Sequence, residues 1–246
     1  MQTLLVDVGN SRVKWALHDG KALHVSGFTH RDQDLSSLLT RHWKDLASPQ
    51  RVIIASVTSE ARKQQLADWI RQHWSLSAEF IVSPAQGQGL INRYREPEKL
   101  GCDRWAAMVA AYHAAHAAVC VVDCGSAVTL DVVDANGQHL GGLILPGVHT
   151  MHTALTAQTA LTPVDFSQLP IQILGHSTRE GIALGITHAI SALVHQTLAE
   201  LQATGVSPRC YLTGGDAALM APLLQCEHVL EPDLVLQGLA IMAHAT

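Results

Sequence analysis

Apolar and polar residues follow one another in a pattern that predicts three strands at the start of the chain. Residues 3–8 are almost all apolar, as in a strand buried on both faces. Residues 12–18 alternate between apolar and polar, as in a strand with one buried face. Asp19-Gly20 is typical of a tight hairpin turn and leads into a third strand at 22–28.

Helical spacing follows these strands. Residues 34–46 and 60–74 carry apolar positions at helical intervals, and short strand-like runs come behind them at 51–57 and 79–82. The predicted order of this part is therefore βββαβαβ. A stretch rich in glycine and glutamine, 84–92, is typical of a domain boundary.

The opening pattern recurs after a predicted alanine-rich helix at 98–118. A buried run at 119–123 precedes an alternating run at 127–133, a hairpin signal at Asn136-Gly137 and a third run at 140–145. The remaining predicted elements are a helix at 178–203, a strand at 209–213 and a terminal helix at 233–245. Two copies of one arrangement indicate a duplicated α/β lobe. We place the boundary between lobes 1–97 and 98–246.

Each copy has a polar turn after its first strand. The two turns are Asp7-Val8-Gly9-Asn10-Ser11 and Asp123-Cys124-Gly125-Ser126-Ala127. Glycine lets backbone approach an anion closely, and successive N–H groups of a turn form an anion-binding concavity. An Asp carboxylate can hold a cation that bridges phosphate oxygens. A single Asp-x-Gly turn is usually structural, but its recurrence in matching contexts favours binding of a nucleoside triphosphate, with Lys14 in reach of the phosphates.

Composition excludes several other classes. The 246 residues are 48% hydrophobic and 15% charged, with a net charge of −5 and a mean hydropathy of +0.15. Such a chain is not disordered, and without a basic run it is not expected to bind nucleic acid. No apolar stretch reaches the roughly 18 residues of a membrane span, and the N-terminus lacks the features of a secretory signal. The five cysteines show no C-x-x-C pair, so we expect reduced thiols in the cytoplasm.

Two further motifs carry candidate chemistry. In Asn92-x-Tyr94-x-x-Pro97-x-x-Leu100-Gly101-Cys102-Asp103-Arg104, a carboxylate lies beside a guanidinium near a helix start. Asp103 could accept a hydroxyl proton and Arg104 could bind an acidic acceptor, although such a neighbouring pair is more often a surface salt bridge. Thr213-Gly214-Gly215-Asp216 follows a strand and is typical of a turn on which a flat ring lies against backbone.

Metal and dinucleotide motifs are missing from the sequence. It contains no P-loop, no G-x-G-x-x-G and no H-E-x-x-H. His149 and His152 have metal-compatible spacing, but because we expect no Cys or carboxylate partner nearby, we interpret them as solvated or capping residues.

Taken together, these motifs resemble the type III pantothenate kinases of the actin/hexokinase/Hsp70-like ATPase superfamily. The matching segments, in order along nearly the whole chain, are DVGNSRVK at 7–14, NRYREPEKLGCDR at 92–104, DCGSAVTLD at 123–131, GGLILPG at 141–147, ALTAQTALTPV at 154–164 and TGGD at 213–216. The resemblance implies two RNase H-like lobes, each opening with a βββ meander, with an ATP cleft between them. It also implies ATP-dependent phosphorylation of pantothenate, the first step of coenzyme A biosynthesis.

Roles follow from the resemblance position by position. The ATP-binding residues it implies are Asp7, Val8, Gly9, Asn10, Ser11, Arg12, Val13, Lys14, Ser126, Gly214 and Gly215. Asp103 matches the general base, and the implied pantothenate pocket comprises Tyr94, Gly101, Cys102, Asp103, Arg104 and, from the partner subunit of a homodimer, Thr178. Asp123 matches the ligand of a monovalent cation, K⁺ or NH₄⁺, and ATP would carry Mg²⁺.

Three positions depart from the family pattern. Ser11 and Ser126 stand where threonine is more usual, and Ser177 stands before Thr178 where the family often has asparagine. Two other functions stay open at this point. A regulatory ATP-binding protein, as in the family's Bvg accessory factor branch, would not need the acceptor pocket that Tyr94, Asp103 and Arg104 form. A sugar or acetate kinase of the superfamily would need a larger substrate domain.

Overall fold

The computed structural model describes residues 2–30, 33–157, 164–166 and 172–244 of the chain. Packing divides the chain into two compact units, here called unit 1 (residues 1–110 and 233–246) and unit 2 (residues 111–232). This division differs from the predicted one, 1–97 and 98–246. The first turns of the third α-helix and the whole terminal helix belong with the first unit.

The sheet of unit 1 has five strands in the order β3-β2-β1-β4-β5. They are β1 (Thr3–Val8), β2 (Arg12–His18), β3 (Leu23–Thr29), β4 (Arg51–Ser56) and β5 (Ala78–Phe80). The first three form an antiparallel meander, whereas β4 and β5 join β1 in parallel. The predicted βββαβαβ order is confirmed.

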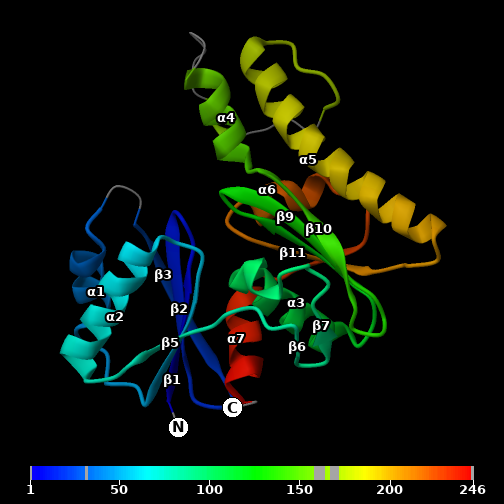
Figure 1. Cartoon of the computed structure of the whole chain (residues 1–246). Coiled ribbons are helices and arrows are strands. Elements are labelled where there is room, and N and C mark those ends of the chain that lie inside the picture. Colours follow the sequence, from blue (N-terminus) through cyan, green and yellow to red (C-terminus); the bar gives the residue numbers. More distant parts are fainter. Residues whose placement is uncertain (1, 31–32, 158–163, 167–171, 245–246) are drawn as a thin grey trace. The chain divides into compact units, whose positions relative to one another are not determined.

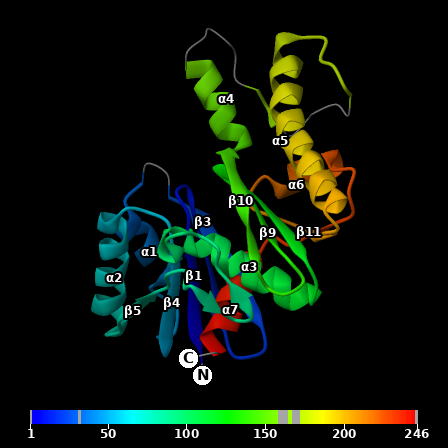
Figure 2. The ribbon, with the colours of Figure 1, turned by 45° about the vertical axis from the view of Figure 1, so that its right-hand side comes forward.

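Helices pack against this sheet and determine where its polar residues lie (Figures 1 and 2). Helices α1 (Leu35–Trp43) and α2 (Glu60–Trp74) share a core with one face of β1 and β2 that includes Val6, Val8 and Val13. Helix α7 (Leu234–His244) contacts β1, β2 and β4. Because side chains alternate along a strand, Asp7 and Lys14 point away from the α1/α2 core.

The segment between β5 and the third α-helix differs from its prediction. It contains a hairpin, β6 (Gln86–Gly87) and β7 (Leu90–Ile91), and a 3₁₀ turn, η1 (Pro97–Lys99). The predicted helix at 98–118 is shorter, because Leu100 has extended backbone and α3 spans Cys102–Ala115. The Ser83 hydroxyl donates to the Leu100 carbonyl at 2.9 Å. Asp103 therefore lies in the first turn of α3.

Unit 2 repeats the sheet topology of unit 1, in the order β10-β9-β8-β11-β12. Its strands are β8 (Val119–Cys124), β9 (Ala127–Val133), β10 (His139–Pro146), β11 (Arg209–Thr213) and β12 (His228–Leu230). The pairings are again two antiparallel followed by two parallel. The predicted duplication is confirmed. Four short elements were not predicted: α4 (Val148–Ala157), α6 (Ala217–Met220), η3 (Ala221–Leu223) and β12.

The long helix α5 (Thr178–Ala203) packs against the sheet of unit 2. Ala183, Ile186, Ile190 and Val194 lie on one of its faces, within the core formed with β8, β9 and β11. Among the described residues it is also the one helix long and apolar enough to cross a membrane, with a mean hydropathy of 1.3 over its most apolar window. Core helices of globular proteins pass the same test, and these four side chains belong to the core of unit 2.

Candidate active site

The turn after β1 is closed by a hydrogen bond between backbone groups. The Gly9 N–H donates to the Arg12 carbonyl at 3.0 Å, and β1 pairs with β2 so that Asp7 lies opposite Lys14. Val8 and Val13 are core residues, each about 1% exposed. Only their backbone groups can therefore contact a ligand, whereas Asn10 and Arg12 are exposed.

Lys14 has a partner that sequence reasoning missed. Its Nζ lies 3.4 Å from the Asp233 carboxylate, and both side chains are partly buried. Asp233 directly precedes α7, the helix that packs against the strand carrying Lys14. The ion pair restricts the long Lys14 side chain near the turn, and only the packing of α7 in unit 1 reveals it.

Asp103 lies at the start of α3, where its carboxylate accepts from the Arg104 N–H at 2.8 Å. A negative charge is favourable in the first turn of a helix. Gly101 leaves the space that this conformation needs, because a Cβ at that position would come within 2.6 Å of the Asp103 Oδ1 atom. The absence of a side chain at Gly101 therefore allows the Asp103 carboxylate to occupy its observed position.

The buried Cys102 thiol links the start of α3 to the end of β4. Burial, together with the negative charges of Asp103 and Asp7, raises the pKa of the Cys102 thiol to about 11. The same thiol donates to the Ser56 carbonyl at the end of β4, at 3.5 Å. Ser56 pairs with Val8 at the end of β1, so this contact places the start of α3, and with it Asp103, at the edge of the sheet where the first polar turn lies. The thiol itself is protonated at neutral pH.

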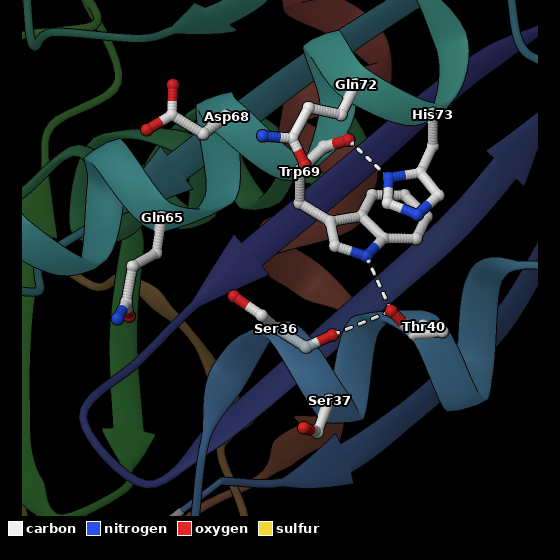
Figure 3. A pocket seen from close by; sticks show the side chains of 8 residues that line it. All are labelled: Ser36, Ser37, Thr40, Gln65, Asp68, Trp69, Gln72 and His73. Carbon is white, nitrogen blue, oxygen red and sulfur yellow. Dashed lines mark hydrogen bonds between the residues drawn. The ribbon is translucent and has the colours of Figure 1, made fainter.

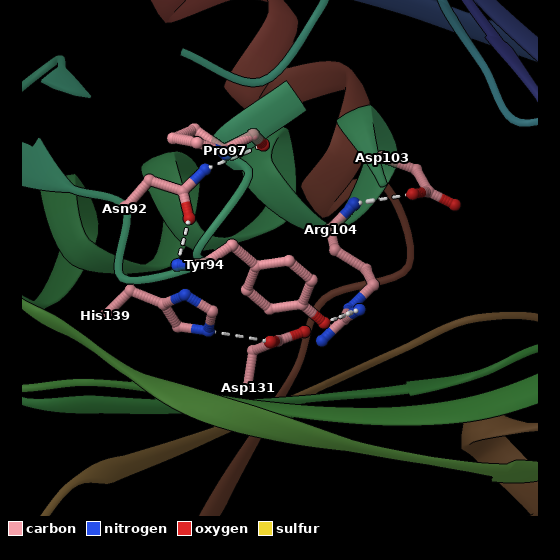
Figure 4. A network of polar contacts seen from close by, with 7 residues as sticks. All are labelled: Asn92, Tyr94, Pro97, Asp103, Arg104, Asp131 and His139. Atoms are coloured by element: carbon pink, nitrogen blue, oxygen red, sulfur yellow. Dashed lines mark hydrogen bonds and ion pairs between the residues drawn. The ribbon is translucent and has the colours of Figure 1, made fainter. Parts of the chain in front are cut away.

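Arg104 and Tyr94 form the second part of this site (Figure 4). The Arg104 Nη1 donates to the Tyr94 hydroxyl at 2.9 Å, and the guanidinium lies 5.6 Å from the centre of the tyrosine ring. Buried Asn92 holds the loop in place, because its amide donates to two carbonyls and its oxygen accepts from the Tyr94 N–H. Arg104 is only 8% exposed, so its contact with Tyr94 is a buried interaction and not the surface salt bridge considered above.

The turn after β8 in unit 2 is similar but one residue shorter. The Gly125 N–H donates to the Ala127 carbonyl at 3.1 Å. Ser126 is exposed, and its carbonyl accepts from the Thr150 hydroxyl at 2.6 Å and from the Gly147 N–H at 2.9 Å. Thr129 lies opposite Asp123, at the place that Lys14 occupies in unit 1. The two turns are thus related in position but not identical in chemistry.

Asp123, Gly214 and Asp216 come together at the ends of two parallel strands. Asp123 of β8 lies in register with Thr213 of β11, and the Asp216 N–H donates to the Cys124 carbonyl at 2.9 Å. Burial raises the pKa of the Cys124 thiol, and the charges of Asp123 and Asp216 raise it further. Burial also raises the pKa of Asp216 itself. Asp123 and Asp216 are both partly buried, and their carboxylates make the electrostatic potential here negative.

The two histidines of α4 have separate partners. His149 Nε2 lies 3.4 Å from the Asp216 carboxylate, which lowers the pKa of that carboxyl and opposes the effect of burial. His152 Nε2 accepts from the Val164 N–H at 3.1 Å. That they do not bind zinc stays a prediction. The expectation that no carboxylate lies near them was wrong, because Asp216 is distant only in sequence.

Thr178 is exposed and begins α5. The preceding residue, Ser177, is the N-cap, and its hydroxyl accepts from the Glu180 N–H at 3.2 Å. Serine and asparagine are both good N-cap residues, so the departure at this position keeps the cap. Residues 158–163 of the ALTAQTALTPV segment lie outside the described part of the chain.

Two other features do not coincide with the predicted site. A pocket of about 600 Å³ lies between α1 and α2 and is lined by polar side chains such as Ser36, Thr40 and Gln72 (Figure 3). It includes none of the predicted residues. Within the described ranges no three His, Cys, Asp or Glu side chains are grouped to hold a metal ion.

Comparison with known proteins decides the family. The family model of type III pantothenate kinase matches residues 3–200. A type III pantothenate kinase of Nitrosococcus oceani is 36% identical over 253 residues, which cover 99% of this chain and 94% of that protein. The chain belongs to the type III pantothenate kinase family. It is therefore a kinase, and the family's reaction is the phosphorylation of pantothenate in coenzyme A biosynthesis.

Solved structures agree with the fold of this kinase family. A Baf family protein of Campylobacter jejuni, titled a transcriptional activator, has a TM-score of 0.65 at 22% identity and covers 98% of both chains. The activator of 2-hydroxyisocaproyl-CoA dehydratase from Clostridium difficile, with bound ADPNP, has a TM-score of 0.58 at 13% identity and covers 100% of this chain and 95% of that chain. These likenesses confirm the actin-like ATPase fold class.

Proposed function

We propose that this chain transfers the γ-phosphoryl group of ATP to the primary hydroxyl of pantothenate, with Asp103 as the general base. The observation that supports this assignment is the position of Asp103 at the start of α3, next to Cys102, whose thiol donates to the carbonyl of Ser56. Ser56 pairs with Val8 of β1, the residue after Asp7, so α3 begins at the edge of the sheet where the first polar turn lies. Phosphoryl transfer depends mainly on positioning and charge neutralisation, so a base next to a phosphate-binding turn is well placed. The regulatory alternative is not favoured, because the acceptor-pocket residues are present and in contact.

Nucleotide binding is assigned to both units. In unit 1 the turn residues Asp7 to Lys14 would bind the phosphates, and in unit 2 Ser126 would add a hydroxyl while Gly214-Gly215 would lie against adenosine. Mg²⁺ bound to the phosphate oxygens would neutralise charge as the bond forms. A cytoplasmic location fits the five free thiols, since reducing compartments keep thiols reduced.

Arg104 is proposed to bind the carboxylate of pantothenate. Its guanidinium is held by the Tyr94 hydroxyl and presents a planar fork of donors, which lysine does not reproduce. Arg104→Lys is expected to raise the KM for pantothenate about tenfold while the KM for ATP changes little. Steady-state kinetics with each substrate varied in turn measures both constants. The matched control is Arg95→Lys on the same loop, an exposed position; an equal rise in both KM values would remove Arg104 from the acceptor pocket.

Asp123 is proposed to hold a monovalent cation. The nearby Asp123 and Asp216 carboxylates make this end of β8 negative, and hard oxygen ligands suit K⁺ or NH₄⁺. We expect activity in potassium or ammonium buffers to exceed that in sodium buffer by about tenfold or more. Initial rates at equal ionic strength test this expectation. Asp123→Asn should remove most of the difference, and equal rates of the unmodified protein in all three salts would contradict the assignment.

The chain is proposed to form a homodimer through unit 2. Leu140, Leu143 and Ile144 of the edge strand β10 are 42% to 62% exposed, and Leu155 of α4 is 41% exposed. An apolar edge of this kind is commonly covered by a second copy related by a two-fold axis. The resemblance additionally places Thr178 of one subunit in the pantothenate pocket of the other.

Subunit exchange tests the shared site. Asp103→Asn and Thr178→Tyr are each expected to be inactive alone. In a mixed dimer one of the two sites receives both native residues, so equal mixing should restore about a quarter of the native activity. Exchange is verified with two affinity tags, and light scattering gives the oligomeric state. A monomer, or no recovery despite verified exchange, would overturn the dimer.

A further inference from the structure

His30 is a fully buried polar residue that contacts the first phosphate-binding turn at two points. It follows β3 directly and has an exposed fraction of 0%. Its ring Nε2 lies 2.8 Å from the Gly9 carbonyl oxygen, and its backbone N–H donates to the Ser11 carbonyl at 3.0 Å. Neither the turn motif nor the family resemblance drew attention to this histidine.

Arg62 of α2 determines which ring nitrogen of His30 carries the hydrogen. The Arg62 Nη1 hydrogen-bonds the His30 Nδ1. Because a guanidinium only donates, Nδ1 must accept. The hydrogen is then on Nε2, where it is donated to the Gly9 carbonyl. The two contacts require the same neutral tautomer, so Arg62 and Gly9 orient the ring consistently.

The bond to Gly9 also determines the direction of the next amide. The Gly9–Asn10 peptide is trans and planar, so the Asn10 N–H points to the side opposite the Gly9 carbonyl. That carbonyl points toward a ring that is wholly buried. The Asn10 N–H is therefore directed away from the interior of unit 1, as a phosphate-binding amide must be, and the negative end of the carbonyl dipole is kept away from the anion.

We infer that His30 is a positioning residue for nucleotide binding: it fixes the Gly9–Asn10 peptide in its phosphate-binding orientation, and Arg62 holds its tautomer. The inference rests on the proposed role of the 7–14 turn in binding ATP. If the carbonyl lost its partner, the peptide could rotate, and the turn would present an oxygen to the phosphates in place of an N–H group.

Replacing His30 by amide side chains of different length tests whether its hydrogen bond to Gly9, and not only its volume, is needed. Glutamine places a donor near the position of Nε2, whereas asparagine is too short to reach the Gly9 carbonyl. We expect His30→Asn and His30→Leu to weaken ATP binding about tenfold, because a buried carbonyl without its donor is costly. His30→Gln should restore most of the affinity. The KM for pantothenate should change less than twofold in all three.

Binding of a non-hydrolysable ATP analogue, measured by calorimetry, gives the affinity without turnover, and thermal melting reports stability. His18→Leu is the matched control, since His18 is also buried in unit 1 but lies at the far end of β2 and contacts Ala22 and His244. The His18→Leu variant should have a lower melting temperature but an unchanged affinity for the ATP analogue. Native affinity in a folded His30→Asn, or equal losses in the Gln and Asn variants, would overturn the inference. If the native protein binds the analogue but does not phosphorylate pantothenate, the proposed function fails and the His30 comparison still stands.

Discussion

Asp103→Asn is expected to lower kcat by about 10²- to 10⁴-fold, the range typical of a positioned general base. The amide keeps the shape of the side chain but cannot take the proton of the acceptor hydroxyl. The variant should fold normally, because its oxygen can still accept from the Arg104 N–H and Gly101 still leaves it room. ATP affinity should stay within about threefold of native, since the phosphate-binding turn is unchanged.

Rapid-quench measurement of phosphorylated pantothenate separates the chemical step from product release in this variant. Asp45→Asn is a suitable control, because Asp45 is an exposed carboxylate of the same unit. Native turnover in Asp103→Asn would exclude this residue as the base. A parallel loss of ATP affinity would instead give Asp103 a role in the nucleotide site.

Gly214→Ala is expected to destabilise the chain by roughly 3 kcal/mol and to abolish activity at ordinary assay temperatures. Gly214 has a φ of +95°, which an alanine adopts only under strain. A Cβ there would lie 2.4 Å from the Asp123 Oδ1 and 2.5 Å from the backbone carbon of Cys124. Backbone cannot move aside as a flexible side chain would, so the end of β8 must shift. Chemical denaturation measures the free energy of unfolding.

Gly215→Ala provides the control next to it. A Cβ at this position meets nothing within 4 Å. This variant should keep native stability, and a rise in its KM for ATP alone would support contact between adenosine and the turn. Equal stability losses in the two variants would show that the close approach of Gly214 to Asp123 does not determine the fold here.

Much of the fold was predictable because the longer strands of its two sheets show simple hydrophobic patterns, either continuously apolar or alternating. The runs at 3–8 and 12–18 become β1 and β2 with the predicted bounds, and the Asn136-Gly137 signal lies between β9 and β10 as expected. Elements with little sequence signal were missed. Strand β12 has only three residues, and α4 follows a proline and a glycine that are more typical of a loop.

The site was predictable where function depends on neighbours in sequence and not where it depends on packing. Asp103 and Arg104 stand in one motif, and their place in the first turn of α3 agrees with its prediction. In unit 1, Asp233 and His30 belong to other segments and reach the 7–14 turn only through the packing of α7 and the end of β3. In unit 2, Asp216 reaches the end of β8 only through the turn after β11. No local pattern distinguishes Asp233 and His30 from ordinary surface or core positions. Asp216 stands in the 213–216 motif, but its contact with His149 depends on packing.

An acceptor panel tests the central claim most directly. The native protein is incubated with ATP, Mg²⁺, a potassium salt and, in separate reactions, pantothenate, pantetheine, glucose and acetate, and the products are identified by mass spectrometry. Asp103→Asn serves as the blank for contaminating kinases. The account predicts phosphorylation of pantothenate that depends on Asp103. Phosphorylation of glucose or acetate without phosphorylation of pantothenate would contradict it.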